Sequence, residues 1–169
     1  PPPAAPATPR PADGAAPHAA SAANRKLTVA VDARGLTYES SLSRGIGQYT
    51  LHHLAALIKR TPGWEYLFCL DDLARSATIA PLARLSNGRA VTFAEAAAVG
   101  PDLYHVPDPM NVGYADFVSP FKKLPGIPTS VVFYDLIPLR FNQTYFDTWR
   151  RNYQLDYLDR LVWLREHAA

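Results

Sequence analysis

Four polar residues occupy places where chemistry could occur, because each stands at the end of an apolar run that has the character of a buried strand. These residues are Asp32, His105, Asp108 and Asp135. In an open parallel sheet the carboxyl ends of the strands share one edge, and ligands bind there. The alternative for Asp32 is local capping of a loop, and for His105 it is a satisfied structural histidine. Asp135 follows the most apolar of these runs, where an acid needs a partner or open solvent.

A glycine pair opens the first helical pattern after Asp32. Gly45 and Gly47 follow Arg44, and glycines at a helix start let a ligand approach the backbone closely. Free N–H groups at such a start favour anions such as phosphate. A tight turn is the alternative explanation. The dinucleotide-binding fingerprint is absent, because the first glycine does not follow the strand directly and Thr50 stands where a third glycine should be.

Alternating apolar patterns predict the elements that position these residues. The order of strands and helices predicts an α/β fold, in which a Rossmann-like parallel sheet has helices on both faces. The predicted strands are 27–32, 64–70, 90–93, 102–106 and 129–134, and the predicted helices are 46–58, 73–85 and 144–167, with a turn at Asn87-Gly88 and a long loop over 107–128.

The chain divides into two parts by composition. Seven Pro and ten Ala fill most of its first 23 positions, so residues 1–25 are expected to form a disordered Pro/Ala-rich linker, either without a role or as a spacer from a preceding domain. Residues 26–169 are expected to form the folded domain. A net charge of +2 argues against nucleic acid as a partner, and the single cysteine, Cys69, excludes a disulfide framework or a cysteine-based zinc site.

Other polar clusters suggest structural roles. His52 and His53 lie in the first predicted helix without a third ligand at a metal-binding spacing, so both are expected on its exposed surface and no metal is expected. Asp71 and Asp72 are expected to end a strand and start the next helix.

Three stretches, taken together and in this order, resemble the N-terminal half of a retaining GT-B glycosyltransferase of the "group 1" family, often called family 4. They are VDARGL at 31–36 followed by RGIGQYT at 44–50, DLYHVPD at 102–108, and VVFYDLIP at 131–138. The last stretch is similar to the family segment V-x-x-H-D-L-x-P. Tyr134 stands where the family commonly has His, and a tyrosine can donate a hydrogen bond there but does not supply a charged imidazole near neutral pH.

The resemblance implies that a sugar moves from a nucleotide-sugar donor to a glycan or lipid-linked acceptor with retained configuration, as in bacterial polysaccharide biosynthesis. The chain would be the truncated acceptor-side domain, inactive without a C-terminal domain that holds the nucleotide. No cofactor or metal is implied. His105 and Asp135 would face the acceptor or the transferred sugar as catalytic residues. The remaining implied donor-phosphate and substrate-binding residues are Arg44, Gly45, Gly47, Asp32, Asp108 and Tyr134.

Two other classes of function stay open. One is a non-catalytic α/β binding or scaffold domain that borrowed this fold, since fold does not fix function. The other is a small phosphate-binding regulator of flavodoxin-like shape. The sequence carries no secretory signal or spanning segment, which favours a cytoplasmic setting and leaves peripheral contact with the inner face of the membrane open.

Overall fold

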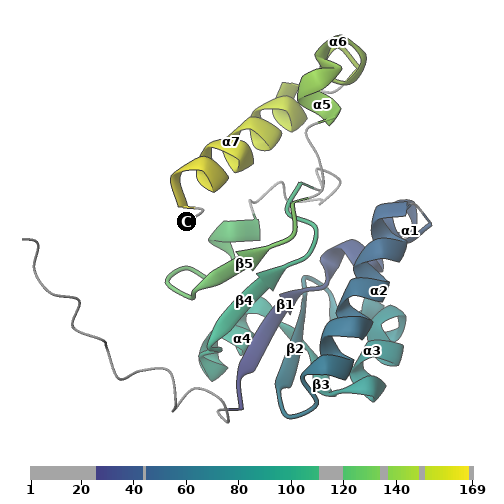
Figure 1. Cartoon of the computed structure of the whole chain (residues 1–169), viewed down its shortest axis with the longest axis vertical. Coiled ribbons are helices and arrows are strands. Elements are labelled where there is room, and N and C mark those ends of the chain that lie inside the picture. Colours follow the sequence, from purple (N-terminus) through teal and green to yellow (C-terminus); the bar gives the residue numbers. More distant parts are fainter. Residues whose placement is uncertain (1–25, 44, 111–119, 134–136, 149–150, 168–169) are drawn as a thin grey trace, which may run out of the picture.

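The computed structural model describes residues 26–43, 45–110, 120–133, 137–148 and 151–167 (Figure 1). Its centre is a five-stranded sheet in the order β3-β2-β1-β4-β5, in which every neighbouring pair is parallel. The predicted Rossmann-like α/β fold is therefore confirmed. The strands are β1 (Thr28–Asp32), β2 (Glu65–Leu70), β3 (Asn87–Thr92), β4 (Leu103–Val106) and β5 (Thr129–Val131).

The strand order creates a switch point beside β1. The chain winds outward from β1 through β2 to β3, then returns across the sheet to β4 and β5. The carboxyl ends of β1 and β4 are neighbours at this reversal, since Val31 pairs with His105. In open α/β sheets this is where a crevice for ligands forms.

Helices cover both faces of the sheet, as the sequence predicts. Hydrophobic residues of α2 and α3 pack against β1 and β2 on one face, and residues of α4, η4 and α7 pack against the other face. The α-helices are α1 (Glu39–Leu42), α2 (Gly45–Arg60), α3 (Ala80–Leu85), α4 (Phe93–Val99), α5 (Ile137–Arg140), α6 (Asn142–Tyr145) and α7 (Arg151–His167), and the 3₁₀ helices are η2 (Arg34–Thr37), η3 (Leu73–Ile79) and η4 (Pro120–Lys122).

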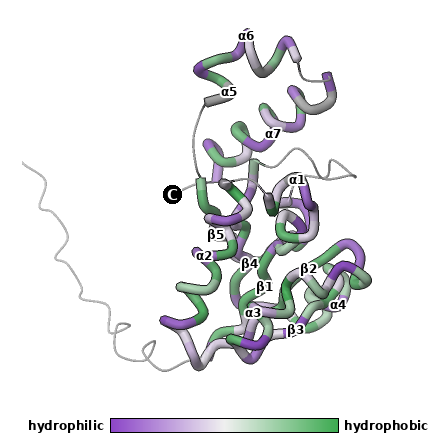
Figure 2. Tube along the Cα trace, turned by 90° about the vertical axis from the view of Figure 1, so that its right-hand side faces the viewer, coloured by the Kyte–Doolittle hydropathy of each residue, from purple (hydrophilic) through white to green (hydrophobic). Residues whose placement is uncertain are grey.

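Alternation along β1 assigns its side chains to the two cores. Val29 and Val31 lie in the core under α2, whereas Ala30 lies in the core under α4 and α7. Hydrophilic and hydrophobic residues alternate along α7 (Figure 2), and Trp163 stacks on Phe121 of η4 with ring centroids 4.0 Å apart. None of the described helices is both long and apolar enough to cross a bilayer.

The predicted turn at Asn87-Gly88 is wrong. Both residues belong to β3, where they pair with Glu65 and Tyr66 of β2. A Cβ at Gly88 would lie 2.7 Å from a ring carbon of Phe68, so the glycine serves close packing inside the sheet. The predicted strand 90–93 is correspondingly too short at its start, and Phe93 begins α4 instead.

The sequence analysis did not predict α4. Its signal is a capping box, in which the Thr92 side chain accepts from the backbone N–H of Glu95 while the Glu95 carboxylate accepts from the N–H of Thr92. The helix ends at Gly100, whose φ of 69° is a left-handed conformation that favours glycine.

Three further predictions need correction. The predicted helix 73–85 is the 3₁₀ helix η3 followed by α3. The strand predicted over 129–134 ends at Val131, and its three residues are partly exposed because β5 is the last strand of the described sheet. The single helix predicted over 144–167 is two helices, α6 and α7. The prediction that Asp71 and Asp72 end a strand and start the next helix is confirmed. β2 ends at Leu70, and Asp72 caps η3 by accepting from the N–H of Ala74.

Candidate functional site

The last residue of β1 anchors a buried ion pair at the carboxyl edge. Asp32 is only 2% exposed, and both of its carboxylate oxygens accept from the Arg34 guanidinium, at 2.9 Å from Nε and 2.8 Å from Nη2. The hydroxyl of Tyr104 on β4 donates to the same carboxylate at 3.1 Å. Burial raises the pKa of Tyr104, so that hydroxyl keeps its proton. The predicted substrate-binding role of Asp32 stays a prediction, and its carboxylate is fully engaged inside the fold.

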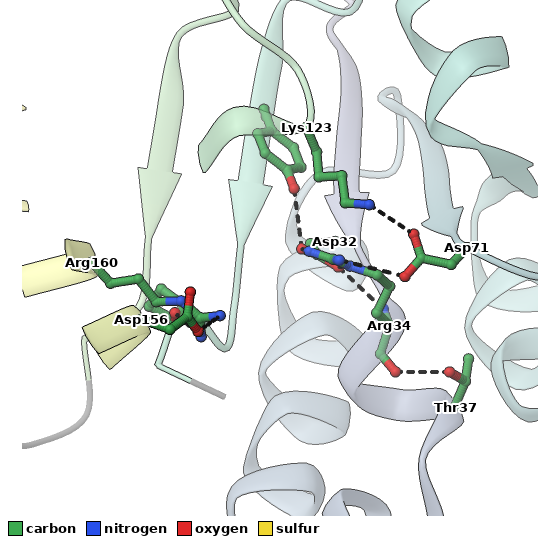
Figure 3. A network of polar contacts seen from close by, with 9 residues as sticks. Asp32, Arg34, Thr37, Asp71, Lys123, Asp156 and Arg160 are labelled. Atoms are coloured by element: carbon green, nitrogen blue, oxygen red, sulfur yellow. Dashed lines mark hydrogen bonds and ion pairs between the residues drawn. The ribbon is translucent and has the colours of Figure 1, made fainter. Parts of the chain in front are cut away.

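The ion pair continues toward solvent through Asp71, which follows β2 (Figure 3). Asp71 accepts from Nη1 of Arg34 at 3.4 Å and from Nζ of Lys123 at 3.1 Å. Both cations also lie over the ring of Phe93, at 5.1 and 5.2 Å from its centroid. Two carboxylates thus balance two cations. The network fixes the loops that follow β1 and β2, and its charges cancel, so it offers no surplus positive charge to a phosphate.

His105 on β4 is the second buried polar group of this region. It is 6% exposed, and both ring nitrogens have partners: Nδ1 lies 2.8 Å from the Ser130 hydroxyl of β5, and Nε2 lies 3.1 Å from Nε2 of His53 on α2. Burial, followed by the charge of His53, lowers the pKa of His105 from 6.5 to about 4. His105 is therefore a neutral imidazole at pH 7.

His53 is the residue that the sequence analysis misplaced. We predicted it on the exposed surface of the helix, but it is half-buried against His105, and its ring stacks in parallel on Tyr49 with centroids 6.0 Å apart. Burial lowers its pKa below 6.5. The signal was its spacing, since His53 lies seven residues after Ile46 and three after Thr50, on the flank of the buried stripe. The exposed position predicted for His52 is confirmed.

The two predicted glycines have different surroundings. A Cβ at Gly47 would lie 2.7 Å from Cα of Leu42 and even closer to the backbone carbonyl oxygen of Ser41, so this glycine permits α1 and α2 to touch. A Cβ at Gly45 would meet nothing within 4 Å, so this position stands open at the first turn of α2. Since α2 runs antiparallel to the strands it joins, its N-terminus lies at the carboxyl edge of the sheet (Figure 1). Gly45 thus remains a candidate for ligand contact.

The turn after β4 is held by α7, which packs on the other face of the sheet from α2. Asp108 is 4% exposed, and Arg160 of α7, also buried, donates from Nη1 to the carbonyl of Pro109 at 3.0 Å. Arg160 also pairs with Asp156 one helical turn earlier. The predicted residues Arg44, Tyr134 and Asp135 lie outside the described residues.

The described residues therefore bring Asp32, His105, Asp108 and the start of α2 to the carboxyl side of one sheet. Ser130, Tyr104 and Lys123 join them through non-local contacts that sequence reasoning did not find. Within the described ranges, no three His, Cys, Asp or Glu side chains group as a metal site. An open hollow of about 370 Å³ lies at the opposite, amino-terminal edge, lined by Lys26, Leu27, Thr28, Gly63, Glu65 and Asn87, and it contains none of the predicted site residues.

No protein-family model, curated protein or solved structure matches this chain. The function must therefore be argued from the site itself.

Proposed function

We propose that this chain is the acceptor-side domain of a retaining GT-B glycosyltransferase, which transfers a sugar from a nucleotide-sugar to a glycan or lipid-linked acceptor. In this proposal residues 26–169 form the N-terminal domain, a separate C-terminal domain holds the nucleotide, and no metal takes part. The enzyme would act in the cytoplasm, in peripheral contact with the membrane where the acceptor is lipid-linked.

One observation carries the proposal: the switch point beside β1 gathers residues of two of the three family-like stretches, 44–50 and 102–108. Gly45 stands open at the start of α2, His105 lies on β4, and Asp108 follows it in the turn that Arg160 holds. Polar groups on a rigid sheet edge suit the hydroxyls of a sugar. The charge-balanced network of Asp32, Arg34, Asp71 and Lys123 supports an acceptor site more than a phosphate site at this part of the edge.

The second candidate is a non-catalytic binding or scaffold domain. It is favoured by the internal engagement of two predicted site residues, since the carboxylate of Asp32 and both ring nitrogens of His105 already have partners inside the fold.

Isothermal titration calorimetry of the whole chain separates the two candidates. The acceptor-side proposal predicts that oligosaccharides or lipid-linked sugar headgroups bind and that nucleotide-sugars without the partner domain do not. Asp108→Asn should weaken that binding, whereas Glu65→Gln, which alters a partly exposed acid at the amino-terminal edge, should leave it unchanged. Circular dichroism confirms that both variants are folded. Absence of any saccharide binding would favour the scaffold, and tight binding of a nucleotide alone would refute both.

A further inference from the structure

The helix α7 carries apolar side chains on two opposite faces, and one of these faces is exposed. The inner face packs on the domain through Tyr157, Arg160, Trp163 and Leu164. The opposite face carries three large apolar side chains, which are Leu155 at 52% exposed, Leu158 at 39% and Val162 at 43%. We call these three residues the outer stripe of α7.

The spacing of the outer stripe is typical of a helix that packs against a second helix. Its residues are separated by steps of three and then four positions, so their side chains lie along one line on the surface of α7. Single exposed apolar residues are ordinary on a protein surface, whereas a continuous row of them marks an interaction site. The outer stripe therefore fits a helical partner.

The charges at the two ends of the outer stripe indicate that this partner is a second copy of α7. Arg151 lies four residues before Leu155 and Glu166 lies four residues after Val162, and both charged residues are exposed. They are equally far from the centre of the stripe and opposite in sign. When two copies of α7 lie antiparallel, Arg151 of each copy comes beside Glu166 of the other. A parallel pair would place like charges beside each other at both ends.

Other charged groups next to the outer stripe have partners within the chain. Asp159, which follows Leu158, lies 3.4 Å from Nζ of Lys122. Arg165 lies 3.3 Å from the carboxylate of Glu166, which can also accept from a second guanidinium. The two Asp159 carboxylates near the centre of an antiparallel pair are thus each balanced by a lysine of the same copy.

We propose that the outer stripe of α7 is the interface of a two-fold symmetric dimer, in which two α7 helices pack antiparallel and Arg151 of each copy pairs with Glu166 of the other. A two-fold interface uses the same patch twice, so three side chains per copy place six in the contact. One helix face is smaller than the roughly 800 Å² per partner of a standard stable interface, so the dimer is expected to be reversible. This inference goes beyond the proposed function and does not depend on it.

Sedimentation equilibrium of the full chain, from about 10 µM to about 1 mM, measures the dimer and its dissociation constant. We expect Leu155→Lys to raise that constant at least about tenfold, because a lysine would enter the apolar contact in both copies. Leu85→Lys is the matched control, since Leu85 is 51% exposed on α3 and should leave the dimer unchanged. Circular dichroism confirms that both variants are folded.

Two charge reversals test the antiparallel arrangement. Arg151→Glu would place a carboxylate beside Glu166 of the second copy, and Glu166→Arg would place a guanidinium beside Arg151, so each alone should weaken the dimer about fivefold. The variant with both reversals should recover most of the affinity. Each reversal also puts a charge of favourable sign at its end of the helix dipole, so a weaker dimer would not reflect fraying of α7.

A chain that stays monomeric at the highest concentration would overturn the proposal. If that monomer instead cosediments with phosphatidylglycerol vesicles, the outer stripe faces a lipid surface. A dimer that tolerates Leu155→Lys forms through another face and also overturns it. Failure of the double reversal to recover affinity would refute the antiparallel arrangement. Saccharide binding by the chain is measured separately, so none of these outcomes decides the proposed function.

Discussion

The buried pair of Asp32 and Arg34 gives a sharp test of what holds the carboxyl edge together. Arg34→Met removes two hydrogen bonds at 2.9 and 2.8 Å from a carboxylate that is 2% exposed. Removing one partner of a buried pair costs about 3–5 kcal/mol, because it leaves an uncompensated charge. Tyr104 and the backbone N–H of residue 34 still donate to Asp32, so the expected loss lies at the lower end, about 3 kcal/mol.

The chain contains a matched control in the pair of Arg89 and Glu65. The N–O distance is again 2.9 Å, but the two side chains are 53% and 42% exposed. Exposed pairs of this kind contribute about 0–1 kcal/mol, so Arg89→Met should lower the free energy of unfolding by no more than that. Urea unfolding at pH 7 measures both variants. With a slope of about 2 kcal/mol per molar urea, Arg34→Met should lower the midpoint by about 1.5 M.

A double variant tests the cause of the loss. In Asp32→Leu with Arg34→Met no unpaired charge remains, so we expect the protein to recover at least about 1 kcal/mol relative to Arg34→Met alone. The reasoning is refuted if Arg34→Met costs no more than Arg89→Met. It is also refuted if the double variant is less stable than the single one, since the loss would then reflect packing against Phe93 or the unpaired hydroxyl of Tyr104 and not an isolated charge.

Three further predictions concern the other parts of the site. The pKa of His105 is about 4 in the folded protein and 6.5 in the unfolded chain, so the unfolded chain binds more protons between these two pH values. The contribution of the neutral His105 to the free energy of unfolding is therefore complete above pH 6.5 and is lost as the pH falls toward 4. Between pH 7 and pH 5, the free energy of unfolding measured in urea should fall by about 2 kcal/mol more in the wild type than in His105→Gln. Gly47→Ala should cost about 1–3 kcal/mol because its Cβ meets the backbone of α1, whereas Gly45→Ala should change thermal stability by less than about 1 kcal/mol; equal effects would contradict this packing. Thr92→Ala should cost about 1 kcal/mol in the same assay by removing the cap of α4, and a neutral result would refute that role.

The sequence predicted the fold class because its local signals agree with the tertiary structure. The apolar runs before Asp32, Asp71 and Pro107 are buried strands, and buried parallel strands need no alternation to be recognised. The helix from Gly45 onward carries a clear stripe that packs on the sheet. Where prediction failed, another interaction prevailed: Gly88 looked like a turn residue, but it is required by the ring of Phe68.

The candidate site could be predicted only in part. The positions of Asp32 and His105 at strand ends follow from local pattern, and their partners do not. The contact of His105 with His53 depends on which helix crosses β4, and its contact with Ser130 depends on the pairing of β4 with β5. These are pairings over 52 and 25 residues that no local pattern specifies.

The most direct test of the central claim is an amide chemical-shift map of the whole chain during titration with an acceptor oligosaccharide. The account predicts shifts at the carboxyl edge, at Gly45, His105 and Asp108, with the amides of Gly63 and Asn87 unmoved at the amino-terminal edge. Shifts confined to the hollow around Gly63 and Asn87 would contradict it, because the ligand would then bind on the side of the sheet opposite to the switch point.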